Sequence, residues 1–195
     1  MTVEKRKYEK KRRAELEDET RRRITETAVE LHGTVGPART SISAIAERAG
    51  VRRSTVYRHF PDEVALFDAC SSHWESVNPL PDPGAWESIE DPDERLRTAL
   101  GELYEFYGRT ERMLANLHRD EVTMPLVAER FARFRGYQST VQELLLNGHD
   151  ERGRARDQTR AAIGHALAFP TWHSLTREQG LTDGQAIELM SRLLH

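Results

Sequence analysis

Residues 41–60, SISAIAERAGVRRSTVYRHF, decide the fold of this part of the chain because they predict two short helices joined by a tight turn. Ser41 precedes the first helix, where its hydroxyl can accept a hydrogen bond from a free amide. Gly50 follows it, where the chain needs a left-handed backbone, and Val51 supplies an apolar contact just beyond. The apolar face of this first helix, about 42–49, has the spacing i, i+3, i+4, i+7 and consists of Ile42, Ile45, Ala46 and Ala49.

The second helix has an apolar underside and a polar outer face. Val56 and Phe60 are one turn apart and point inward with Val51. The outer face holds hydrogen-bond donors, two guanidinium groups and a phenol, and no carboxylate, which suits phosphates and base edges. Helix, glycine turn and polar-faced helix are typical of a helix-turn-helix, although an ordinary amphipathic pair gives the same pattern. The outward residues are Arg53, Ser54, Thr55, Tyr57, Arg58 and His59.

The residues from Ile24 to Leu66 resemble the N-terminal DNA-binding domain of TetR-family transcriptional regulators. The resemblance covers about the first third of the chain and implies a sequence-specific regulator that binds double-stranded DNA. It rests on the spacing of Ile24, Ala28 and Leu31, on Gly36, and on the segments Thr40-Ser41-Ile42, Ile45-Ala46-Glu47-Arg48-Ala49-Gly50-Val51 and Thr55-Val56-Tyr57-Arg58-His59-Phe60.

We predict that the outward face of the second helix contacts DNA, and that Ser41, Ser43 and Arg52 contact backbone phosphates beside it. By resemblance, Tyr57 and His59 reach phosphate or base edges. Two positions depart from the family pattern. Arg52 stands where a serine or threonine usually caps the recognition helix, and Glu63 stands where a lysine is common. A carboxylate repels phosphate, so we expect no DNA contact at Glu63.

Beyond this region the pattern stays helical and nothing indicates a sheet, so the expected fold class is all-α. Four of the eight prolines lie in residues 77–92, which we expect to be a loop. The expected division is a charged extension (1–19), a DNA-binding domain (20–66) and a helical effector-binding and dimerisation domain (67–195). The expected helices are about 20–33, 42–49, the one after Arg52, 62–76, 93–109, a short one containing Met113, 125–147, 155–177 and 182–194, with Pro170 as a kink or boundary.

Charge is distributed unevenly along the chain. Residues 1–63 hold 15 Lys and Arg against 11 Asp and Glu, a net charge of +4, whereas the rest carries −7 to give the total of −3. The positive end is the one with the predicted helix-turn-helix. The absence of an apolar span and of a signal sequence predicts a cytoplasmic protein that does not enter a membrane. The single Cys70 lies on an apolar stretch and is expected to be a buried, inert thiol.

Residues 4–23 are dense in charge, and two interpretations remain open for them. Such stretches are usually disordered tails or solvated helix extensions. Basic arms ahead of DNA-binding domains can also lie in the minor groove.

A helix pair of this size buries too little surface to bind tightly alone, so we expect a homodimer on two half-sites. The family resemblance implies dimerisation through the last two helices and a small-molecule effector, of unidentified class, held by the central helices. The ring residues could equally be ordinary core. The candidate lining residues are Trp74, Trp86, Tyr104, Tyr107, Met113, Phe131, Phe134, Phe169 and Trp172.

No cofactor, metal site or catalytic site is expected. His118 with Asp120 and Glu121, and His165 with His173, lack a spacing that places two ligands on one helical face. The fingerprints of hydrolases, zinc proteases and nucleotide-binding enzymes are missing. The alternative function is a helix-turn-helix regulator whose C-terminal domain senses a protein partner instead of a small molecule.

Overall fold

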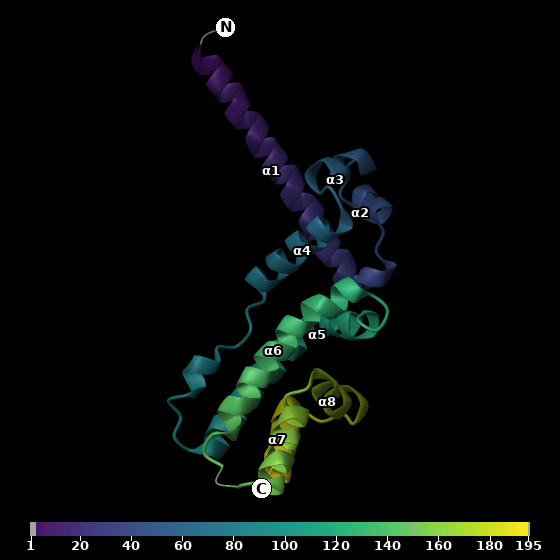
Figure 1. Cartoon of the computed structure of the whole chain (residues 1–195). Helices are drawn as coiled ribbons and strands as arrows, with labels where there is room; N and C mark the ends of the chain where they lie inside the picture. Colours follow the sequence, from purple (N-terminus) through teal and green to yellow (C-terminus); the bar gives the residue numbers. More distant parts are fainter. Residues whose placement is uncertain (1–2, 150, 195) are drawn as a thin grey trace. The chain divides into compact units, whose positions relative to one another are not determined.

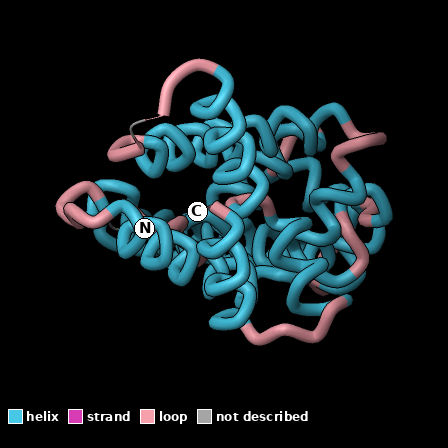
Figure 2. Tube along the Cα trace, turned by 90° about the horizontal axis from the view of Figure 1, so that it is seen from below, coloured by secondary structure: helices cyan, strands magenta, loops and turns pink. Residues whose placement is uncertain are grey.

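The computed structural model describes residues 3–149 and 151–194. Helices and loops make up this described part of the chain, without a strand, which confirms the all-α prediction (Figure 2). It forms two compact units. The N-terminal unit comprises residues up to Val77 together with Asn116–Leu126, and the C-terminal unit comprises Asn78–Ala115 and the residues from Val127 onward.

In the N-terminal unit, α1 packs against three shorter helices (Figure 1). The apolar faces predicted from sequence meet here, with Ile24 and Ala28 of α1 fully buried against Ile45, Val56 and Phe60. The elements are α1 (Val3–Thr34), η1 (Pro37–Arg39), α2 (Ile42–Arg48), α3 (Arg53–His59) and α4 (Glu63–Val77).

Helix α1 begins at Val3, far earlier than the start near residue 20 that its apolar spacing predicted. From Lys7 to Glu19 these added turns are exposed and bury no apolar face. Their Lys, Arg and Glu residues are good helix formers, and ion pairs one turn apart support them, as between Arg13 and Glu17 at 3.2 Å. Apolar periodicity therefore identified only the packed part of the helix.

Helix α4 starts where its acidic cap predicted, because the Asp62 carboxylate accepts a hydrogen bond from the Ala65 amide at 2.7 Å. The sequence spacing of Leu66, Ala69, Cys70, His73 and Val77 predicts that these residues face inward, and this prediction is wrong for Val77. Val77 is 62% exposed, whereas Phe67, which we did not predict to be buried, packs against His32 with ring centroids 5.6 Å apart. The last turn of α4 lies at the edge of the unit, so its apolar residue has nothing to cover it.

Cys70 is buried on α4, as predicted. Its thiol donates a weak hydrogen bond to the Thr25 carbonyl at 3.8 Å, and burial raises the pKa of the Cys70 thiol to about 12. The thiolate that redox and alkylation chemistry require is therefore strongly disfavoured.

The C-terminal unit contains the remaining elements, except that the last turn of α5 and the α5–α6 turn belong to the N-terminal unit. Within 3–149 and 151–194, no helix combines the length and apolar composition of a membrane span. The elements are η2 (Pro83–Trp86), α5 (Pro92–Asp120), α6 (Pro125–Leu146), α7 (Arg154–Ala166), α8 (Phe169–His173), η3 (Ser174–Glu178) and α9 (Asp183–Leu193).

Helix α5 is one continuous helix, whereas the sequence pattern predicted a break near residue 109. Gly108 was the weak point, since glycine costs about 1 kcal/mol within a helix. Leu103, Tyr107 and Leu114, on both sides of Gly108, are almost completely buried. Burial on this scale outweighs the glycine and keeps the helix intact.

Pro170 marks a boundary, one of the two outcomes predicted. Helix α7 ends at Ala166, Ala168 is extended, and Pro170 lies in the first turn of α8, where a missing amide hydrogen does no harm. Helix α9 begins with a capping box between Thr182 and Gln185, and the spacing of these two residues in the sequence is typical of that motif.

Candidate nucleic-acid interface

A capping hydrogen bond begins α2, and a glycine turn separates it from α3. Ser41 Oγ accepts a hydrogen bond from the Ala44 amide at 3.1 Å, which begins α2. Gly50 adopts φ +64°, and the Val51 amide then donates to the Ala46 carbonyl at 2.9 Å, which ends it. Both features match the sequence prediction. They leave α3 beginning at Arg53 after a single extended residue.

Helix α3 is anchored by its underside. Val56 and Phe60 are each 1% exposed. Arg21 of α1 holds the far end, because its guanidinium donates to the His59 carbonyl at 2.6 Å and lies 4.2 Å from the centre of the Phe60 ring. Helix α3 is therefore held in place along its buried side and at its C-terminal end.

The predicted outward face of α3 is outward in the structure. Five of its positions are exposed, including Arg52 just before the helix, and two are half-buried. No acidic residue interrupts this face within the helix. The exposed positions are Arg52, Arg53, Ser54, Tyr57 and Arg58, and the half-buried ones are Thr55 and His59.

Arg53 and Tyr57 form a pair on this face. Arg53 Nη2 donates to the Tyr57 hydroxyl at 3.1 Å, and the guanidinium lies 5.5 Å from the ring centre. The hydrogen bond raises the pKa of Arg53, with a smaller contribution from the Glu63 carboxylate. Glu63 is thus a negative charge close to Arg53, and the absence of a DNA contact at Glu63 stays a prediction.

His59 differs from its neighbours on α3. Burial, and then the charges of Arg58 and Arg21, lower the pKa of His59 below its usual value, so the ring is neutral near pH 7. Its Nε2 atom is buried and has no hydrogen-bond partner. We retain the DNA contact at His59 as a prediction, now through a neutral ring.

The three residues predicted beside α3 have different surroundings. Ser41 already uses its oxygen as the cap of α2 and keeps its hydroxyl proton for another acceptor. Ser43 is exposed on α2. Arg52 occupies the N-cap of α3 without a side-chain cap bond, as expected of a residue that has no acceptor.

Sequence reasoning missed a set of contacts that join the end of α5 to the last turn of α1 and to the loop after it. Asn116 Nδ2 donates to the His32 and Gly33 carbonyls at 2.9 and 3.0 Å. Arg119 Nη2 donates to the Val35 carbonyl at 2.9 Å. These residues lie more than 80 positions apart, and no local pattern links them. The N-terminal unit is therefore completed by residues from the second half of the chain.

Asp120 is part of the same set. Its carboxylate accepts from the Ala38 amide at 3.0 Å and from the Arg119 guanidinium at 2.7 Å. Burial by itself raises the pKa of the Asp120 carboxyl, but these donors hold it below its ordinary value. The sequence suggested Asp120 only as a candidate metal ligand. In the structure its carboxylate instead binds the Ala38 amide in the loop after α1.

The candidate effector residues fall into both units. Trp74 lies on α4 in the N-terminal unit, and the others lie in the C-terminal unit. Trp86 is 1% exposed on η2 and Met113 is 9% exposed on α5. Six rings form a connected cluster with neighbouring centroids 5.5 to 6.4 Å apart: Tyr104, Tyr107, Phe131, Phe134, Phe169 and Trp172.

The two phenols in this ring cluster have structural partners. Tyr104 donates to the Ala166 carbonyl at 2.9 Å and Tyr107 to the Leu167 carbonyl at 2.5 Å, and Gln138 donates to both Tyr107 and Leu167. These carbonyls face the break between α7 and α8, where helix hydrogen bonding stops. Burial raises the pKa of both phenols above the ordinary value for tyrosine.

The histidines considered as metal ligands have other neighbours. His118 Nδ1 lies 3.4 Å from the Glu121 carboxylate, His173 Nε2 lies 3.8 Å from that of Glu111, and a nitrogen of His165 lies 3.3 Å from the Thr171 hydroxyl. Among the described residues, His, Cys, Asp and Glu do not gather in groups of three that could hold a metal ion.

Fold and surface together define a helix-turn-helix DNA-binding protein. Residues 24–70 match the family model of bacterial regulatory proteins of the tetR family. Residues 24–70 therefore form a DNA-binding domain of the kind found in this family, and the match includes the segment Ile24–Leu66 that the sequence resemblance covered. No curated protein sequence matches the chain significantly.

Solved structures with the same fold extend the likeness to most of the chain. A TetR-like transcriptional regulator from Rhodococcus sp. RHA1 is 20% identical over 90% of this chain and 93% of its own, with a TM-score of 0.63. A regulator from Saccharomonospora viridis in complex with choline is 19% identical over 91% and 95%, with a TM-score of 0.57. NalD, the secondary repressor of the MexAB-OprM multidrug efflux pump in Pseudomonas aeruginosa, is 21% identical over 92% and 95%, with a TM-score of 0.57.

Proposed function

We propose that this regulator is a ligand-responsive repressor that binds a palindromic operator as a homodimer. The observation that carries the proposal is the outer face of α3, which is exposed, cationic and free of carboxylates while its underside is buried. Helices of this kind enter the major groove and read base edges there.

The proposed DNA contacts divide into two kinds. Arg53 and Tyr57 point outward as a pair from the first turns of α3 and are assigned to base edges or to the phosphates next to them. Ser41, Ser43 and Arg52 lie beside the start of α3 and are assigned to phosphates, which position the protein without reading sequence. Ser54, Thr55, Arg58 and His59 complete the proposed surface.

Dimerisation is proposed through α7 and α9. Leu193 of α9 is 68% exposed, and Ile187, Leu189 and Leu194 are half-buried. On α7, Ala155 and Ala161 are exposed and would allow a second helix to approach closely. Light scattering should give twice the 22.4 kDa of one chain. Leu193→Glu should yield monomer, whereas Val122→Glu, at a more exposed apolar position, should not.

The effector is proposed to be an apolar or aromatic small molecule that binds at the ring cluster of the C-terminal unit. An effector that binds better to the conformation unable to span both half-sites must weaken DNA binding by the same factor. The alternative is a protein partner sensed by the C-terminal unit. Release of bound DNA by a small apolar compound supports the first proposal, and release only by a protein from the same cell supports the second.

Selection of bound duplexes from a random pool, followed by fluorescence anisotropy at several salt concentrations, tests DNA recognition. A palindromic consensus and tight, salt-dependent binding are expected. Arg58→Ala should weaken binding about tenfold, and Arg97→Ala, an exposed arginine of the C-terminal unit, should leave it unchanged. A promoter carrying the consensus should be silenced by the protein. Equal affinity for consensus and competitor DNA would overturn the proposal.

A further inference from the structure

The N-terminal turns of α1 form an isolated surface. Every residue from Lys7 to Glu19 is exposed, so this part of the helix packs against nothing within the unit. Side-chain contacts on these turns are local, such as the pair between Lys11 and Glu15 at 3.7 Å. A helix that is polar on all sides and buries no face gains little from its own chain. A partner outside the chain is the natural source of further stabilisation.

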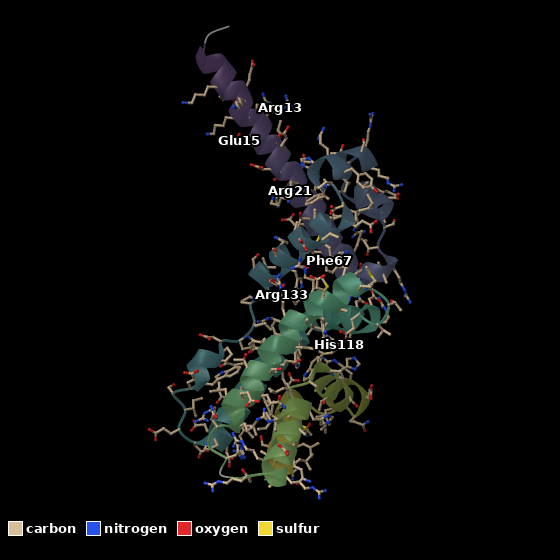
Figure 3. All side chains as sticks on the ribbon, in the orientation of Figure 1. Arg13, Glu15, Arg21, Phe67, His118 and Arg133 are labelled. Atoms are coloured by element: carbon tan, nitrogen blue, oxygen red, sulfur yellow. The ribbon has the colours of Figure 1, made fainter. Side chains whose placement is uncertain are left out.

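This surface continues from the recognition helix. Arg21 marks the point where α1 touches the end of α3, through the His59 carbonyl and the Phe60 ring. The exposed turns extend beyond α3 from there, with Arg13 and Glu15 along them (Figures 1 and 3). At 1.5 Å per residue, Lys7 and Arg13 lie about 21 and about 12 Å ahead of Arg21 along the helix axis. A duplex carries one phosphate per about 3.4 Å along each strand, so a duplex bound at α3 that continues along α1 would have phosphates within this range.

The charge on these turns is sorted by direction. Successive residues of an α-helix are rotated by about 100°. The residues whose directions lie within about 80° of that of Arg21 therefore form one side of α1. From residue 7 to residue 14, this side carries four cations and no carboxylate, while the opposite side mixes both signs with Tyr8 and Leu16. Two of the four have an exposed carboxylate partner one turn further on, Glu15 for Lys11 at 3.7 Å and Glu17 for Arg13 at 3.2 Å, and such surface pairs are weak. The four cations are Lys7, Lys10, Lys11 and Arg13.

We propose that this basic side of α1, residues 7–13, is a second DNA contact that binds phosphates outside the base pairs contacted by α3. The inference rests on the proposed operator binding and extends it. Because it is a helix and not an extended arm, it is assigned to the backbone rather than to the inside of the minor groove. The contribution of this basic side to DNA affinity is electrostatic and independent of the base sequence. It requires a duplex long enough to reach residues 7–13.

The test compares the full chain with two double variants of equal charge. Lys7→Gln/Lys10→Gln removes two cations from the side of Arg21. Arg12→Gln/Arg23→Gln removes two exposed cations about 160° to 180° away on the same helix. Binding is measured to the minimal operator and to the same operator lengthened by about 10 base pairs, one helical turn, at each end.

Wild type and the arginine variant should bind the longer duplex about tenfold more tightly than the minimal one. The lysine variant should lose this gain, and the slope of log K against log salt should fall by about 2 per protomer. Equal affinity of lysine variant and wild type for the long duplex would overturn the inference, as would an equal loss on both duplexes. Failure of the proposed function looks different, because wild type would then prefer neither operator over competitor DNA.

Discussion

Arg53 and Tyr57 face outward from α3 one turn apart, and the Arg53 guanidinium donates to the Tyr57 hydroxyl at 3.1 Å. The ring and the hydrogen bond restrict the directions in which this arginine can point. A guanidinium already held in place loses less conformational freedom when it binds a base edge or phosphate.

Tyr57→Phe should therefore weaken operator binding although it removes only one oxygen atom. We expect about tenfold lower affinity by fluorescence anisotropy and a change below about 0.5 kcal/mol in the free energy of unfolding, because the site is exposed. Tyr8→Phe, at an exposed tyrosine of α1, is the matched control and should change neither. Unaltered affinity in Tyr57→Phe would show that the hydroxyl does not position Arg53.

Glu63→Lys should strengthen DNA binding. The carboxylate lies close enough to Arg53 to contribute to its raised pKa, so reversal of the charge removes a repulsion toward phosphate and adds an attraction. We expect affinity to rise about fivefold and the salt slope to increase by about 1 per protomer. Glu87→Lys changes the net charge equally at an exposed site of the C-terminal unit and should have no effect. A gain of the same size in both variants would point to net charge alone.

Gly36→Ala should destabilise the N-terminal unit much more than Gly50→Ala. Both glycines have positive φ, +95° and +64°. At Gly36 an added methyl group would overlap the Arg119 guanidinium and the Asp120 carboxylate, whereas at Gly50 no other atom lies within 4 Å. We expect a loss of about 3 kcal/mol at Gly36 and about 1 kcal/mol at Gly50, measured by urea unfolding. Equal losses would mean that the contacts of Arg119 and Asp120 adapt freely.

The stability of the protein should fall in mild acid because of His32. Burial lowers the pKa of His32 to about 4, and the nearby Asp120 carboxylate offsets only part of this effect. Between about pH 6.5 and 4 the unfolded chain binds a proton that the folded chain does not. The free energy of unfolding should therefore decrease by about 3 kcal/mol over this range.

Urea unfolding at pH 7 and at pH 4.5 measures this effect, with His32→Leu as the comparison. The variant lacks the titrating ring and should lose less stability than wild type between the two values. Asp120 does not contribute to this comparison. Its pKa is lowered from 3.8, so the stability that its carboxylate provides is lost only below about pH 3.8. Parallel decreases in the two proteins would assign the acid sensitivity to other groups.

The sequence was sufficient for the helix-turn-helix because the interactions that build it are local. The Ser41 cap and the Gly50 turn involve residues a few positions apart. Val56 and Phe60 pack against Ile24 and Ala28 of α1, but their spacing of one helical turn marks them as inward residues. Each of these features can be recognised in the sequence from the spacing or the type of its residues. The exposed face of α3 then follows from which residues are buried.

Other features left no such mark. The contacts of Asn116 with the last turn of α1 and of Asp120 with the following loop join residues more than 80 positions apart. The continuity of α5 through Gly108 depends on burial that the pattern does not reveal. The first turns of α1 carry no apolar periodicity, which was the signal used to locate helices.

The bonds of Tyr104 and Tyr107 to Ala166 and Leu167 have a consequence for chemical selectivity in the C-terminal unit. Each phenol proton is already committed to a backbone oxygen. A bound molecule that accepts a hydrogen bond from either phenol would leave the backbone carbonyl without its donor, at a cost of about 1–3 kcal/mol. Compounds without oxygen or nitrogen acceptors escape this penalty, so the fold itself would discriminate by polarity before any contact of shape is made.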